Sequence, residues 1–253
     1  MIKELSESAR VAGKVLAHAS RETKDAAIEA IAAALLQREN EILAANSEDV
    51  QRSREEGISE SLIDRLTLTA PRIAGIAGGA RKIKALPDPV GLTKRERTLP
   101  NGLHLKQVTV PFGVVGMVYE ARSNVTVDAA VILLKSGNCA LLRGSSSAKR
   151  SNEVLVSIMR DAVASVGLPA NVIQLVPSTD RASVTELLHA RGFVDLVIPR
   201  GSAALIRTVV DEAKVPTIET GAGVCHVYVD KDGDLAKALP ILINSKVQRP
   251  SVC

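Results

Sequence analysis

The second half of this chain alternates between short apolar runs and helical segments, and no other feature constrains the fold as strongly. Strand-type runs lie at Val114–Tyr119, Asn138–Leu142, Val172–Val176, Val194–Ile198 and Val224–Val229. Helical segments lie between and after them, at Val125–Lys135, Ala148–Val166, Ala182–Ala190, Ala203–Ala213 and Leu235–Asn244. Continuous apolar strands separated by helices predict a mostly parallel sheet that is covered on both faces. Such a sheet binds ligands beyond the carboxyl ends of its strands, at a switch point in strand order.

The first part of the chain divides into a helical segment and an insertion. Residues 1 to about 85 place apolar residues at helical spacing, as in the Ala-rich stretch Asp25–Leu36. Residues 94–110 then change to a period of two around Asn101-Gly102, which is a strong hairpin signal. A hairpin inserted here either pairs with another subunit or is a plain surface hairpin, and the residues leave both open. We therefore expect an α/β fold with a helical N-terminal segment and an inserted β-hairpin.

Composition excludes several classes of function. The 253 residues include 32 basic and 28 acidic side chains, which are interspersed, and 2% aromatic residues with no Trp. This pattern lacks the stacking platforms of a protein that binds single-stranded nucleic acid, and the net charge of +4 suits small anionic ligands. Three widely spaced cysteines and four scattered histidines indicate neither a disulfide framework nor a metal site. The polar N-terminus and the short apolar stretches predict a soluble, cytoplasmic protein without a membrane segment.

Cys253 is a candidate nucleophile. It follows a polar turn that contains Pro250, with Lys246 and Arg249 close by in sequence. The thiolate is the reactive form, and it needs an electropositive, partly exposed setting. Composition alone favours the other interpretation, a free cysteine near a frayed terminus. Cys139 and Cys225 fall within predicted strands, where we expect them to be buried.

Two strand-to-helix turns are candidates for binding an anion. Residues 143–150 and 200–203 each pass from an arginine at a strand end through Gly-Ser into a helix. Free backbone N–H groups at a helix N-terminus suit a phosphate. A serine N-cap explains either turn without a ligand, but two such turns in one sheet favour one. The candidate cofactor-binding residues are Arg143, Gly144, Ser145, Ser146, Gly201 and Ser202.

Short motifs along the chain occur in an order and spacing that resemble the aldehyde dehydrogenase superfamily. They lie at Pro111–Gly116, Leu168-Pro169, Arg200–Ser202, Glu219–Gly221 and Gln248–Cys253. Three longer segments are similar in sequence to the branch of this superfamily that reduces γ-glutamyl phosphate. They are Val118–Thr126, Ile218–Asp230 and Gln248–Cys253. The resemblance covers the whole chain. It implies an NADP-binding domain with a Rossmann-like sheet over residues 1–247, with the helical part at 1–85, an oligomerisation-type hairpin at about 94–110 and βα units at 111–247.

The resemblance also implies a reaction. An NADPH-dependent oxidoreductase of proline biosynthesis would reduce γ-glutamyl phosphate to glutamate-5-semialdehyde and release phosphate. Cys253 would form a thioester with the acyl group, and a thioester accepts hydride more readily than a carboxylate does. The resemblance further implies a homo-oligomer of full-length chains and a possible functional coupling to glutamate 5-kinase. Residues 248–253 would begin a catalytic domain whose remainder is absent, so we expect little activity from this chain alone.

The resemblance assigns roles to further residues. Asn124 is the candidate donor to the oxyanion, and Arg122 is an alternative for that role. If Asn124 has no catalytic role, its presence is explained by a position at the cap of the following helix. Glu219 matches the general base of the superfamily in position. Activating water would waste the acyl phosphate, so a role in orienting the thiol or in proton transfer is open instead. Arg122 and Arg249 are the candidate substrate-binding cations.

The turn at 143–150 bears on the choice of cofactor. Arg143 matches a position that holds Lys near the adenosine ribose, and hydroxyls and cations follow it, with no acid until Glu153. This pattern favours NADP(H), because a carboxylate would repel the 2′-phosphate. Gly144–Ser146 departs from the Gly-Gly-Lys-like turn of the branch, which leaves the phosphate contacts open. The alternative functions are a non-catalytic dinucleotide-binding module and an aldehyde-oxidising semialdehyde dehydrogenase.

Overall fold

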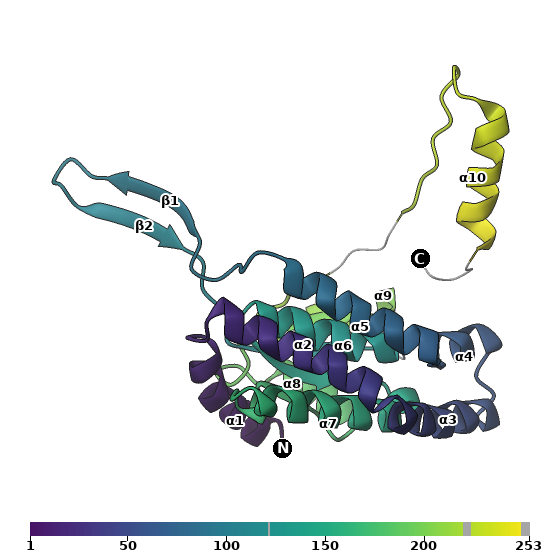
Figure 1. Ribbon diagram of the computed structural model, residues 1–253, viewed down its shortest axis with the longest axis horizontal. Helices are drawn as coiled ribbons and strands as arrows, with labels where there is room; N and C mark the ends of the chain where they lie inside the picture. Colours follow the sequence, from purple (N-terminus) through teal and green to yellow (C-terminus); the bar gives the residue numbers. More distant parts are fainter. Residues whose placement is uncertain (121, 220–223, 249–253) are drawn as a thin grey trace.

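A computed structural model describes residues 1–120, 122–219 and 224–248. It has the expected order, with helices first, then a projecting hairpin, then alternating strands and helices (Figure 1). Within the first 85 residues the helices are α1 (Ile2–Leu16), α2 (Arg21–Gln37), α3 (Glu39–Glu55), α4 (Glu60–Leu66) and α5 (Ala70–Ala85). Ser20 caps α2 by accepting a hydrogen bond from Thr23 N at 3.2 Å. None of the helices in the described part of the chain is long and apolar enough to cross a membrane.

The sheet holds four parallel strands in the order β5-β4-β3-β6. These strands are β3 (Val114–Tyr119), β4 (Cys139–Arg143), β5 (Ile173–Leu175) and β6 (Leu196–Arg200). Every residue of β3 is buried, as expected for a central strand with helices on both faces. The chain adds β4 and β5 on one side of β3 and then β6 on the other. The strand order therefore reverses between β3 and β6, and their carboxyl ends form the switch point.

Helices cover both faces of the sheet. The connecting elements are α6 (Ser123–Lys135), η1 (Ser146–Ala148), α7 (Lys149–Ser165), η2 (Ala170–Val172), α8 (Arg181–Leu188) and α9 (Ala203–Glu212). On one face α6 and α7 pack under α2 and α5, and on the other α1 packs against the strands and α8. Cys139 of β4 is buried as predicted, and its thiol donates to Ala9 O of α1 at 3.2 Å. Burial raises the pKa of the Cys139 thiol to about 12.

The hairpin consists of β1 (Thr93–Thr98) paired antiparallel with β2 (His104–Val108). Its turn contains Gly102 at φ +86°, a conformation that glycine adopts without strain. All side chains of both strands are exposed, because the hairpin projects away from the body of the molecule (Figure 1).

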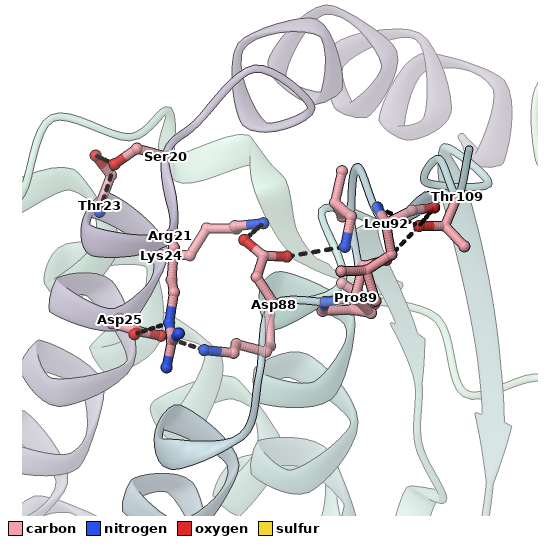
Figure 2. A network of polar contacts seen from close by, with 12 residues as sticks. Ser20, Arg21, Thr23, Lys24, Asp25, Asp88, Pro89, Leu92 and Thr109 are labelled. Atoms are coloured by element: carbon pink, nitrogen blue, oxygen red, sulfur yellow. Dashed lines mark hydrogen bonds and ion pairs between the residues drawn. The ribbon is translucent and has the colours of Figure 1, made fainter. Parts of the chain in front are cut away.

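A buried ion pair fixes the base of the hairpin to the helical part (Figure 2). Lys24 of α2 is 2% exposed, and its Nζ lies 2.6 Å from Asp88 Oδ2. Burial alone would raise the pKa of Asp88. The hydrogen bonds that it accepts from Lys24 and from Val90 N lower the pKa by more, so the net pKa lies below its usual value. Next to this pair, Lys135 of α6 binds Asp25 of α2. The chain segment that leads into β1 is therefore held to α2 by the Lys24–Asp88 pair, and the neighbouring Lys135–Asp25 pair joins α2 to α6.

One predicted strand is wrong. Residues 224–229 form no strand, and the edge beside β6 is occupied instead around Thr217, where Val197 N donates to Pro216 O at 2.9 Å. A strand needs hydrogen-bond partners, and nothing in the described ranges pairs with 224–229. The βα units of the sheet consequently end near residue 218, and Cys225 is exposed, contrary to the prediction. Helix α10 (Leu235–Val247) forms close to its predicted bounds, but none of its residues is buried.

Candidate functional site

The carboxyl ends of the parallel strands bring most of the predicted site residues to one edge of the sheet. Arg122 and Asn124 follow β3, residues 144–146 follow β4, and residues 201–202 follow β6. Glu219 is exposed and lies two residues beyond the bridge at Thr217. Cys253 and Arg249 lie outside the described residues, so their positions relative to this edge stay a prediction.

A cavity of about 320 Å³ opens beside the switch point, a volume typical of small-molecule sites. Helices α4, α5 and α6 and the loop after α4 supply its walls. The lining residues are Arg65, Thr67, Leu68, Arg72, Gly75, Ile76, Arg122, Asn124 and Asp128. Two predicted residues, Arg122 and Asn124, therefore share a pocket with two further arginines and one carboxylate.

Asn124 is not a helix cap. The cap position of α6 belongs to Arg122, and Asn124 is the second helical residue. Its Nδ2 donates to Asp128 Oδ2, one turn later, at 3.1 Å. Burial raises the pKa of Asp128, and the hydrogen bond from Asn124 only partly opposes this, so the net pKa is above its usual value. Asn124 thus presents an amide donor at the pocket, next to a partly desolvated carboxylate.

The sequence interpretation missed two arginines of this pocket. Arg72 is held in place, because it donates to Asp64 Oδ1 at 2.6 Å and to Thr67 O at 2.7 Å. Arg65 is half-buried, and it forms no hydrogen bond or ion pair with any of the described residues. Arg65 lies in α4 and Arg72 in α5, both before residue 85, where no motif or periodicity marks either residue as functional.

Arg143 is held by the loop that follows β5. Its guanidinium is half-buried and donates to Thr179 O at 2.6 Å and to Asp180 O at 3.1 Å. Burial lowers the pKa of Arg143. Packing requires glycine at position 144, because a Cβ there would lie 2.2 Å from Asn152 Nδ2. These contacts shape the turn, whatever ligand it holds.

The N-terminus of α7 is already occupied by a carboxylate, contrary to the expectation of free N–H groups. Asp49 of α3 is fully buried and accepts hydrogen bonds from Arg150 N at 3.2 Å and Ser151 N at 2.8 Å. Arg52 binds Asp49 at 2.6 Å and also donates to Ser146 O at 3.0 Å. A phosphate therefore cannot use these two N–H groups, and Ser145 and Ser146 can contact one only from the solvent side of the turn.

The N-terminus of α9 has a similar arrangement. Ser202 caps the helix by accepting from Leu205 N at 3.4 Å, and its own N–H donates to Glu120 Oε1 at 2.9 Å. A Cβ at Gly201 would lie 2.7 Å from Glu120 Cδ, so glycine is needed for this contact. The exposed Glu120 carboxylate, which the sequence interpretation missed, thus sits where an anionic ligand was expected.

A shallow hollow lies between the carboxyl ends of β4 and β5, with Gly144, Ser145 and Lys149 in its wall. It measures only about 10 Å³, so it can hold an exposed edge of a ligand but cannot enclose one. A hydroxyl, a cation and backbone groups fit a sugar phosphate. Glu153 also lines the hollow, with its Oε2 3.4 Å from Arg150 Nη1. Among the described residues, no group of three or more His, Cys, Asp or Glu side chains could hold a metal ion.

A helical segment, a projecting hairpin and a parallel sheet with a pocket at its switch point define a known class of protein. The chain belongs to the aldehyde dehydrogenase family, whose model matches residues 1–249. The resemblance inferred from the motifs is therefore confirmed for the family, together with the α/β fold.

Among its relatives, the chain is 56% identical over 252 residues to a γ-glutamyl phosphate reductase of Thermobifida fusca. The match covers 100% of this chain and 60% of that protein. A γ-glutamyl phosphate reductase of Thermotoga maritima superposes with a TM-score of 0.92 at 43% identity, over 100% of this chain and 61% of that one. The corresponding enzyme of Saccharomyces cerevisiae gives a TM-score of 0.79 at 32% identity, over 97% and 62%. The chain thus spans about three fifths of the length of these relatives.

Proposed function

We propose that this chain is the dinucleotide-binding part of an NADPH-dependent γ-glutamyl phosphate reductase. The observation that carries the proposal is the 56% identity to such a reductase along the whole chain. The pocket supports it, because Arg65 and Arg122 line it and cations suit a substrate with a carboxylate and a phosphate. In this proposal residues 1–247 are the NADP-binding domain, and residues 248–253 begin the catalytic domain.

The proposed chemistry uses Cys253 as the nucleophile. Its thiolate attacks the acyl phosphate, the C–O bond to phosphate breaks, and a thioester forms as inorganic phosphate leaves. The Asn124 amide donates to the oxyanion that develops during this attack, a contribution typically worth roughly 10²–10³ in rate. NADPH, when bound, supplies the hydride that reduces the thioester to the aldehyde. Glu219 orients the thiol or transfers its proton, rather than activating water.

A preference for NADP(H) is part of the proposal. Ser145, Ser146 and Lys149 offer hydroxyls and a cation for the 2′-phosphate at the open side of the turn after β4. The nearest acid on α7, Glu153, lies beside Arg150, which offsets its charge. We further propose that the enzyme is cytoplasmic, serves proline biosynthesis, and forms a homo-oligomer that includes the hairpin. Functional coupling to glutamate 5-kinase belongs to the same proposal.

The test uses the full-length enzyme in the reverse direction, from glutamate-5-semialdehyde and NADP⁺. A reductase must release its acyl group to phosphate, so NADPH formation should rise with phosphate or arsenate from near zero. Cys253→Ala should abolish this activity while NADP⁺ binding stays unchanged, and NAD⁺ should be the poorer cofactor. Glu219→Gln should slow the reaction only modestly.

Two outcomes would contradict the proposal. A rate that is independent of phosphate, together with near-total loss in Glu219→Gln, would indicate hydrolysis of the thioester and hence a semialdehyde-oxidising dehydrogenase. Nucleotide binding without turnover under any condition would indicate a non-catalytic dinucleotide-binding module.

A further inference from the structure

We propose that Arg65 and Asp128 recognise the α-amino-acid head of the substrate, with Arg65 binding its carboxylate and Asp128 its ammonium group. This inference deepens the proposed function and rests on it. It assigns the end of the substrate remote from the reacting carbon to the pocket between α4, α5 and α6.

The first argument is the state of Arg65. A half-buried guanidinium normally has partners, because burial of an unpaired charge is costly. Arg65 has none among the described residues, although the neighbouring Arg72 is fully engaged by Asp64 and Thr67. Arg65 therefore keeps its donors available on the pocket wall, and a planar guanidinium fits a carboxylate in a bidentate pair.

The second argument is the state of Asp128. Of its two carboxylate oxygens, Oδ2 accepts from Asn124, while Oδ1 has no hydrogen-bond partner in the described structure. The glycines of α5 leave this oxygen uncovered, because a Cβ at Gly79 would lie 4.0 Å from it and one at Gly75 would meet nothing within 4 Å. A partly buried carboxylate with an open oxygen is a suitable partner for an ammonium group.

The third argument is spacing. Asn124 and Asp128 lie about one turn apart on α6, a rise of about 6 Å. In the substrate four bonds separate the amino nitrogen from the reacting carbonyl carbon, a comparable reach. The two side-chain tips lie closer together than this rise, with Asn124 Nδ2 3.1 Å from Asp128 Oδ2. The open Oδ1 of Asp128 can hold the ammonium group while the second N–H of the Asn124 amide faces the carbonyl oxygen.

The test removes one charge from the protein and the matching charge from the substrate. We would measure kcat/KM of the full-length enzyme for glutamate-5-semialdehyde, for 5-oxopentanoate, which lacks the amine, and for 4-aminobutanal, which lacks the carboxylate. The wild-type enzyme should prefer the complete substrate by roughly tenfold to a hundredfold over each analogue. Arg65→Gln should remove the preference over 4-aminobutanal only, and Asp128→Asn the preference over 5-oxopentanoate only.

Matched controls separate recognition from damage to the fold. Arg54→Gln, an exposed arginine on α3, should leave all three values unchanged. Gly75→Leu should fill the pocket and raise KM for all three aldehydes, whereas Gly78→Leu, equally free of close contacts but outside the pocket, should not. Equal losses on all three substrates in Arg65→Gln and Asp128→Asn would overturn the head-group assignment. If the wild-type enzyme oxidises none of them, the proposed function itself fails.

Discussion

Asp128 carries a stability cost that its proposed role in binding the substrate's ammonium group would explain. Burial raises its pKa above the ordinary value of 3.8, so ionising this carboxyl costs more free energy in the folded protein than in the unfolded chain. Asp128 therefore lowers the free energy of unfolding at neutral pH, where its carboxyl is ionised. This cost disappears once the pH falls below the pKa of the unfolded chain. A residue that costs stability in this way is typical of a ligand-binding position.

This predicts that Asp128→Asn raises the thermal midpoint of unfolding at pH 7. The gain should shrink as the pH is lowered through the ordinary carboxyl range, because the native carboxyl then becomes neutral as well. Calorimetric scans of the wild type and the variant between pH 7 and pH 4 would measure it. A lower midpoint in the variant at pH 7 would mean that Asp128 is a stabilising structural residue.

For single residues, the sequence predicted which motif residues lie at the site better than it predicted the neighbours that they contact. Arg122 and Asn124 were correctly assigned to the strand-to-helix turn after β3, because a motif marked them. Arg65 and Glu120 were not recognised, since their roles depend on neighbours supplied by other elements. Single arginines and glutamates on exposed segments carry no periodic or spacing signal.

Among the secondary-structure elements, the pairing of α3 with α7 most affects the candidate cofactor turn. Asp49 and Arg52, one turn apart on α3, hold the start of α7 and the carbonyl of Ser146 together. The shape of the serine turn is thus set by a helix about a hundred residues earlier in the chain.

Asp49→Ala should destabilise the protein by about 2 kcal/mol, because the buried N–H of Ser151 and the part-buried N–H of Arg150 lose their acceptor. Hydrogen exchange at the amides of Arg150 and Ser151 should accelerate, which reports on the local loss directly. Glu55→Ala is the control and should alter neither quantity, because Glu55 is exposed on the same helix and its carboxylate accepts only from Gln51 among the described residues. Unchanged exchange at both amides in Asp49→Ala would show that the cap does not hold α7.

The sequence predicted elements well where the pattern is local. Helix α2 and strand β3 form because apolar periodicity and continuous apolar runs are properties of the segment itself. The apolar run at Val224–Val229 has the same composition as a strand, but strand formation needs a neighbour, and the sheet edge is taken by residues 216–218. The prediction of free N–H groups at the N-terminus of α7 was wrong for the same reason. The acceptor for these groups is Asp49, which lies about a hundred residues earlier in the chain.

For the whole molecule, the hairpin is the feature that invites an interface. A two-stranded hairpin is marginally stable alone in water, yet β1 and β2 carry no buried side chain. Their apolar side chains include Leu105 and Val108, both exposed.

If the hairpin pairs with another subunit, Leu105→Asp should lower the assembly state of the full-length enzyme, measured by light scattering during size-exclusion chromatography. The charge would oppose burial of this position in an interface. Leu62→Asp on α4 is the matched control, since Leu62 is 44% exposed and Leu105 42%. An unchanged mass for Leu105→Asp would support a plain surface hairpin.

The ion pair between Lys24 and Asp88 also has a mechanical consequence. Strand β1 has six residues, a length of about 20 Å. A rotation of about 5° at its base would therefore carry the far end of the hairpin through about 2 Å, an estimate from that same strand length. At this base the buried Lys24–Asp88 pair and the hydrogen bond from Thr109 Oγ1 to Pro89 O at 2.6 Å hold the chain (Figure 2). The few polar contacts at the base therefore limit how far a partner bound at the tip can shift.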